Sequence, residues 1–153
     1  MTTLLIQSCS ATKHSVENPV PALDLYDGYF FRIIKKARRA DQLNPGLDIL
    51  ILSAKHGIIK PTDEIGYYDQ RMDTDRAREL NDDVVATIAE KVATESYSKV
   101  WVNLGKDYQP AVDGLAEAVD VPVAHIDGAG IGIKGKQLKQ LVSSTHTTPA
   151  YGD

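Results

Sequence analysis

The chain has 153 residues, a net charge of −4, and 42% apolar and 25% charged residues, which is an ordinary globular composition. This length fits one domain, and we expect residues 1–142 to form it, followed by a polar tail over 143–153. The negative net charge excludes a general attraction to nucleic acid or anionic membranes, so any basic binding surface has to be local.

Four apolar runs alternate with helical patterns along the chain. The runs, which we predict to be strands, cover residues 4–6, 49–52, 100–102 and 121–124. Four helices are predicted: over about 29–39, after a cap at Asp73 or Thr74, after Pro110, and over about 136–142. The apolar face of the second consists of Leu80, Val84, Ile88 and Val92.

Residues 57–72 have no clean periodicity and predict a long ordered loop, which in a compact domain is more often functional than idle. Strands that alternate with helices indicate an α/β fold. We expect a three-layer sandwich with a central, mostly parallel sheet of at least four strands and right-handed crossovers.

The single cysteine, Cys9, excludes a disulfide framework and indicates a reducing compartment. A first strand that begins almost at Met1 leaves no room for a signal peptide, and no apolar run has membrane-spanning length. We therefore expect a cytoplasmic protein with no membrane partner.

Each predicted strand ends in polar, reactive or glycine residues. Ligands of open parallel sheets bind outside the carboxyl ends of the strands, so these residues are expected to line one site. They are Ser8, Cys9, Ser10 and Lys13 after the first strand, Ser53, Lys55 and His56 after the second, Asn103, Gly105 and Lys106 after the third, and Asp127 after the fourth.

Two of these positions carry the chemistry of the expected site. Cys9 stands between two serines, and nearby cations turn a thiol into a nucleophile; the alternative is a small buried core residue. His56 can exchange protons near neutral pH, and Lys55 beside it can hold an anion. The alternative for His56 and Lys55 is a solvated strand end at which Gly57 makes the turn.

Aromatic residues and a possible anion site complete the candidates. Residues 67–72 combine tyrosines, an acid, an amide and an arginine, which suits a flat heteroaromatic ligand with Tyr68 stacking on it and Asp69 bonding to it. A loop that packs its tyrosines onto the sheet is the alternative, for Tyr26 as well. Backbone amides at 103–108 can hold a phosphate or carboxylate, assisted by Lys106.

Two further patterns favour simple explanations. Gly130, Gly132 and Gly135 form a G-x-G-x-x-G, but a dinucleotide fingerprint follows the first strand and needs an acid about 20 residues later. A loop that wraps a ligand and one that lets a helix pack closely both stay open. No standard spacing supports zinc ligation by Cys9, His14, His56 and an aspartate, so we expect no metal and no cofactor.

Five basic residues fall within the first predicted helix. Positive side chains near a helix C-terminus stabilise the macrodipole, and a solvated face is the favoured explanation. Contact with a phosphate backbone is the alternative. The residues are Arg32, Lys35, Lys36, Arg38 and Arg39.

Four motifs occur together in the first half of the chain: Ser8–Lys13, Pro21–Tyr26, Leu52–Gly57 and Tyr68-Asp69. Together they resemble a largely uncharacterised prokaryotic and phage family sometimes labelled peroxide stress protein YaaA-like.

Cys9-Ser10-x-x-Lys13 also resembles, more weakly, a segment of the archaeosine synthase amidinotransferase domain. That domain is related to the uracil-DNA glycosylase-like α/β fold and acts on a deazaguanine base in transfer RNA. The aromatic and proline part of its motif is absent here, since His14-Ser15 follow Lys13. The resemblance implies an α/β fold, a nucleobase as substrate, and site roles for Cys9 and Lys13.

We therefore predict an enzyme that acts on a nucleobase, a nucleotide or a base in nucleic acid, by N-glycosidic cleavage or exchange or by base modification. Cys9 or Lys13 is the expected nucleophile or anchor, and His56 the acid/base. Asp69 or Asp127 is expected to polarise water or stabilise positive charge on the sugar. The alternatives are a non-catalytic nucleic-acid-binding or stress-response module and a small-molecule transferase. The base, the choice of DNA or RNA and the oligomeric state stay open.

Overall fold

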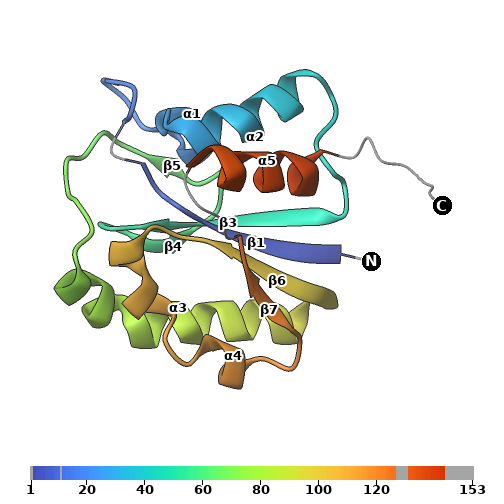
Figure 1. The fold of residues 1–153 in the computed structure, drawn as a ribbon. Coiled ribbons are helices and arrows are strands. Elements are labelled where there is room, and N and C mark those ends of the chain that lie inside the picture. Colours follow the sequence, from blue (N-terminus) through green and yellow to red (C-terminus); the bar gives the residue numbers. More distant parts are fainter. Residues whose placement is uncertain (1, 11, 127–130, 144–153) are drawn as a thin grey trace.

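A five-stranded sheet runs through the middle of the molecule, with helices on both of its faces (Figure 1). The computed structural model describes residues 2–10, 12–126 and 131–143. The strand order is β4-β3-β1-β6-β7. The strands are β1 (Thr2–Ser8), β3 (Leu47–Ser53), β4 (Gly57–Ile59), β6 (Tyr97–Asn103) and β7 (Val123–His125).

The central strand β1 pairs in parallel with β3 on one side and with β6 on the other. β7 is parallel to β6, and only β4 is antiparallel to its neighbour. The chain runs from β1 to β3 in one direction and then crosses back to β6, so the strand order reverses between β1 and β6. The carboxyl ends of the strands at such a switch point form the crevice in which open α/β sheets bind ligands.

Two helical layers cover the sheet (Figure 1). Side chains of β1 alternate between the two faces: Leu5 packs in the core beneath one layer, and Leu4 and Ile6 in the core beneath the other. The first layer contains α1 (Ala22–Leu25), α2 (Tyr29–Arg39) and α5 (Ile131–Val142). The second contains α3 (Thr74–Thr94), the 3-10 helix η1 (Lys106–Val112) and α4 (Leu115–Ala118).

The structure confirms the predicted three-layer α/β fold with a mostly parallel sheet. The helix predicted over 29–39 has those bounds, and the Asp73 side chain caps α3 by accepting a hydrogen bond from the amide of Arg76 at 2.7 Å. None of the described helices is long and apolar enough to cross a membrane.

Three local predictions were wrong. The segment 57–72, predicted as a loop, contains β4 and also β5 (Glu64–Ile65), which pairs with β2 (Val20–Pro21). The helix predicted after Pro110 is divided between η1 and the four-residue α4. α5 begins at Ile131 rather than near residue 136. Asp127, Gly130 and the tail from residue 144 lie outside the described residues.

Candidate active site

Cys9 and Tyr108 meet at the switch point between β1 and β6. The Cys9 amide donates to the carbonyl of Leu52 at 2.9 Å, which continues the β1–β3 pairing to this residue. Tyr108 belongs to η1, and its hydroxyl lies 3.1 Å from the Cys9 sulfur and donates to the Cys9 carbonyl at 3.3 Å. Burial raises the pKa of Tyr108, so the phenol is protonated at neutral pH. Its one proton is used in the bond to the Cys9 carbonyl, so the phenol oxygen is placed to accept from the Cys9 thiol.

A cavity of about 180 Å³ opens beside this thiol. It lies between the loop after β1 and the end of the segment that connects β5 to α3. Its wall combines a thiol, a hydroxyl, an ammonium group, a carboxylate, an amide and a guanidinium. The residues are Cys9, Ser10, Lys13, Asp69, Gln70, Arg71, Met72 and Tyr108.

The ring of Tyr68 is surrounded by the basic residues expected at the site. The ammonium nitrogen of Lys13 lies 4.5 Å from the ring centre, and that of Lys55 lies 5.9 Å from it. Both distances are within the range of cation–π attraction. The ring of His56 approaches at 5.4 Å with its plane at 87°. Tyr68 is 6% exposed, close to the 8% of Cys9, and its ring supports the cations. The stacking of this ring on a ligand stays a prediction.

A chain of buried hydroxyls lies beneath this ring. The Ser53 hydroxyl accepts hydrogen bonds from the amides of Lys55 at 3.2 Å and His56 at 3.1 Å, and lies 2.9 Å from the Tyr68 hydroxyl. A hydroxyl has two acceptor lone pairs and one proton. Since both lone pairs of Ser53 are used, its proton goes to Tyr68, and Tyr68 in turn donates to the hydroxyl of Tyr26.

These hydroxyls are structural groups rather than ligand contacts. Ser53 and Tyr26 are fully buried, so the substrate-binding roles predicted for them are wrong. Burial raises the pKa of Tyr26 to about 12, and it raises the pKa of Tyr68 as well. Both phenols therefore keep their protons, and the chain of donors holds the turn that carries Lys55 and His56.

His56 is held at the end of this turn by an arginine of α3. The Arg76 guanidinium donates to the carbonyls of Ala54 at 2.7 Å and Lys55 at 3.0 Å. His56 itself is exposed, but partial burial of its ring against Tyr68, and then the charge of Lys55, lower its pKa. The imidazole is therefore neutral near pH 7 and can accept a proton.

Lys55 and His56 are not part of the cavity wall. Both lie beside the ring of Tyr68, and Lys13, which lies beside the same ring, lines the cavity. The predicted residues are thus divided into two adjacent groups, one in the cavity and one beside Tyr68.

The remaining predicted residues have separate positions. Asn103 is 1% exposed and donates to the side chain of Gln7 at 2.9 Å, while Gln7 donates to the carbonyl of Ser8 at 3.2 Å. These bonds join β6 to β1, so the almost fully buried Asn103 is structural and its predicted substrate contact is wrong. The bond from Gln7 uses only the backbone carbonyl of Ser8, and the predicted substrate contact of the Ser8 side chain stays a prediction. Gly105 and Lys106 are exposed at the start of η1 and are not in the cavity wall.

Sequence reasoning did not name five contributors to the site: Gln70, Arg71, Met72 and Tyr108, which line the cavity, and Arg76. Tyr108 and Gln70 stand in segments that the sequence marked as candidates, but nothing in their spacing indicates contact with Cys9. Arg76 reads as an ordinary residue of an exposed helical turn.

Comparison with known proteins places the chain in a family. The model of a family of unknown function, DUF6884, matches residues 4–141. The chain belongs to this family. None of the curated proteins matches it.

Among solved structures, the crystal structure of AF0587, a protein of unknown function, is similar to this DUF6884 member with a TM-score of 0.54 and 14% sequence identity. The match covers 96% of this chain and 46% of that one. At this identity the likeness shows the fold alone.

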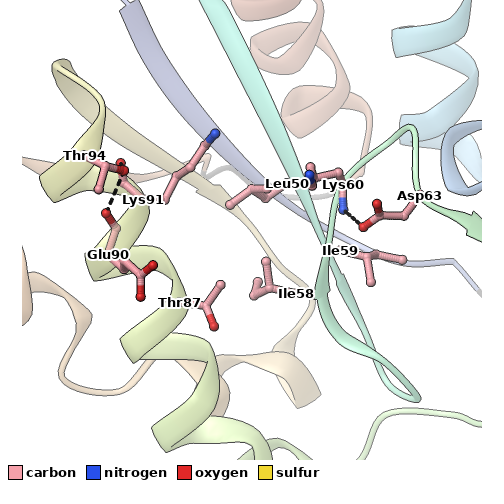
Figure 2. A pocket seen from close by; sticks show the side chains of 9 residues that line it. All are labelled: Leu50, Ile58, Ile59, Lys60, Asp63, Thr87, Glu90, Lys91 and Thr94. Atoms are coloured by element: carbon pink, nitrogen blue, oxygen red, sulfur yellow. Dashed lines mark hydrogen bonds between the residues drawn. The ribbon is translucent and has the colours of Figure 1, made fainter.

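A larger cavity of this DUF6884 member, about 420 Å³, lies between α3 and the strands β3 and β4 (Figure 2). Two hydrogen bonds join groups drawn there: the Lys60 amide donates to Asp63 at 2.8 Å, and the Thr94 hydroxyl donates to the Glu90 carbonyl at 3.0 Å. None of the described residues that line this cavity is a cysteine, histidine or tyrosine. The chemically equipped site is therefore the smaller cavity at Cys9.

Within residues 2–10, 12–126 and 131–143, no three histidine, cysteine or acidic side chains gather closely enough to hold a metal ion. The ligand set considered for zinc, which includes Cys9, His14 and His56, is thus not assembled in this part of the chain.

Proposed function

We propose that this protein is an enzyme that acts on a nucleobase, free, in a nucleotide or in nucleic acid. The proposed reaction is cleavage or exchange of an N-glycosidic bond or modification of the base. The observation that carries the proposal is the cavity at the switch point, whose wall joins the Cys9 thiol, the Lys13 ammonium and the Asp69 carboxylate. Its volume of about 180 Å³ suits one ring system, since pockets for drug-sized ligands span about 300–1,000 Å³.

The polar wall offers the hydrogen-bonding groups that a base edge requires. The carboxylate of Asp69 accepts, the guanidinium of Arg71 donates, and the amide of Gln70 does both. Bases are read through such mixed donors and acceptors on their edges. The likeness of Cys9-Ser10-x-x-Lys13 to the archaeosine synthase segment supports the same substrate class.

In the proposed chemistry, Cys9 is the nucleophile and the Tyr108 hydroxyl orients its sulfur. Lys13 holds an anionic group of the substrate or the charge that develops on the base. Asp69 stabilises positive charge on the sugar or polarises water. His56 is the acid/base, and because it stands outside the cavity wall, it serves the part of the substrate that projects toward the rim.

A thermal-shift screen of nucleobases, nucleosides and nucleotides tests the substrate class. A ligand present at about 100 times its Kd stabilises a protein by about 2.7 kcal/mol, which at this chain length raises Tm by about 5–10 °C. We expect Asp69→Asn to remove the shift. Asp75→Asn is the matched control, because that carboxylate is 91% exposed on α3, and it should keep the shift.

Turnover is tested by chromatographic detection of released or modified base. Cys9→Ser should abolish it, and His56→Ala should lower the rate by about 10²–10⁴-fold with little change in Tm, because the residue is exposed. Full activity of the His56 variant excludes it as acid/base. No shift and no product across the screen would contradict the proposal. Salt-dependent binding of oligonucleotides without turnover would favour the non-catalytic module.

A further inference from the structure

The helices α2 and α5, which cover one face of the sheet, are strongly basic. α2 has five basic and no acidic residues, and α5 has three basic and no acidic residues. On the opposite face, α3 has five acidic and three basic residues. The net charge of −4 therefore conceals a cationic face.

Part of this positive charge is neutralised locally. Arg32 pairs with Asp27 at 3.2 Å and Arg38 pairs with Asp24 at 2.8 Å. Arg32, through its hydrogen bond to the carboxyl of Asp27, holds the pKa of that group below its ordinary value. Lys35 is buried and also lies 3.5 Å from Asp27. These pairs partly neutralise three of the cations on this face.

Three other lysines line a groove of about 390 Å³ between α2 and α5, which lie side by side (Figure 1). Lys36 comes from α2, and Lys136 and Lys139 come from α5. Among the described residues, none of the three forms an ion pair with a carboxylate. Ile33 contributes apolar surface, and Tyr29, at one end of the groove, is 46% exposed.

Glycine explains how the tyrosine reaches this position. A Cβ atom at Gly135 would lie 2.4 Å from the hydroxyl of Tyr29 and 2.5 Å from its ring, so only glycine lets the side chain cross α5 this closely. Gly132 also lines the groove. The described part of the G-x-G-x-x-G pattern therefore serves the groove, and Gly130 lies outside the described residues.

We propose that this groove binds the backbone of a single-stranded nucleic acid, with its lysines on phosphates and Tyr29 stacked on a base. Cationic grooves that carry exposed aromatic rings are the usual means of binding single strands. The charge of this face complements phosphodiesters, and none of the described residues that line the groove is acidic.

The groove is connected to the candidate active site through neighbouring residues of the chain. The Gly28 amide donates to the Ser10 hydroxyl at 3.2 Å, Ser10 lines the cavity at Cys9, and Tyr29 is the next residue along the chain. A strand that extends from the groove past Tyr29 toward Ser10 would present one base to the cavity. This step rests on the proposed function, whereas binding in the groove requires no turnover.

Fluorescence anisotropy with a short fluorescein-labelled oligothymidylate, repeated with oligouridylate, tests the groove. The matched variants are Lys36→Gln/Lys136→Gln/Lys139→Gln and, outside this face, Lys60→Gln/Arg78→Gln/Lys91→Gln. Both remove three positive charges. Each lost phosphate contact lowers the slope of log K against log salt by about 0.7. We expect the groove variant to lose about 2 in slope and more than 10-fold in affinity, and the control to bind like wild type.

Substitutions of Tyr29 test the stacking contact separately. Tyr29→Leu keeps the bulk over Gly135 but removes the ring, so it should weaken binding by about 5- to 150-fold, whereas Tyr29→Phe should keep the affinity. Equal affinities of the two lysine variants would overturn the inference. So would tighter binding to vesicles of anionic lipid than to the oligonucleotides.

The nucleobase thermal shift separates this inference from the proposed function. Shifts by free bases that persist without any binding of oligonucleotides would reject the groove and leave the enzyme proposal standing. Oligonucleotide binding that the lysine variant loses, without any nucleobase shift or product, would support the groove and reject the base site.

Discussion

The Tyr68 hydroxyl is the central member of the buried chain beneath the candidate site, so its removal is a sharp test of the hydrogen-bond assignment. In Tyr68→Phe the Ser53 proton loses its acceptor and the Tyr26 oxygen loses its donor. A buried polar group left unsatisfied costs about 1–3 kcal/mol. We expect a loss of about 2 kcal/mol, which at this chain length lowers Tm by about 4–8 °C.

Calorimetry or chemical denaturation measures this loss against Tyr67→Phe, the same chemical change one residue away on a side chain that is 52% exposed. The control should change stability by less than about 0.5 kcal/mol. The double variant with Ser53→Ala should lose less than the sum of the single losses, by about 0.5–3 kcal/mol, because both changes remove the same bond. Equal stability of the two phenylalanine variants, or full additivity, would refute the assignment.

Two further predictions concern the close contacts of the site. Gly28→Ala places a Cβ 2.6 Å from that of Ser10 and should cost about 1–3 kcal/mol by overpacking, whereas Gly66→Ala, with open space around it, should cost little; denaturant midpoints measure both. The pKa of His56 lies below its ordinary 6.5, so the unfolded chain takes up the proton first, and this contribution to stability is complete above about pH 6.5 and lost as pH falls below it. An NMR titration should show the low midpoint, and Lys55→Gln should raise it; a midpoint at or above 6.5 would contradict the assignment.

The fold could be predicted because its central strands are long apolar runs. Residues 4–6 and 50–52 are buried on both faces of the sheet, and such runs between helical patterns indicate parallel strands. The two- and three-residue strands β2, β4 and β5 could not be predicted, since segments this short have no periodicity. Their pairing depends on where the long strands bring the connections together.

The site could be predicted only as a neighbourhood. Cys9, Ser10 and Lys13, which follow β1, do line one cavity, as strand ends in a parallel sheet favour. Asp69 lines the same cavity from the segment between β5 and α3. The function of Tyr68 depends instead on which protons and lone pairs of its neighbours are already used in other hydrogen bonds, and the sequence does not reveal this. A tyrosine beside an acid has the same pattern whether its ring stacks on a ligand or supports a cation from within the core.

The contact between Ser10 and Gly28 links the two proposed sites, and this link makes them separable by experiment. Asp69→Asn changes the cavity without altering the groove, and the lysine variant changes the groove without altering the cavity. Gly28→Ala disturbs this contact, because the added methyl group has to displace either Ser10 or the start of α2. If a strand in the groove delivers its base to the cavity, this variant should weaken turnover on an oligonucleotide more than turnover on a free nucleoside. Equal losses on the two substrates would show that the groove and the cavity act independently.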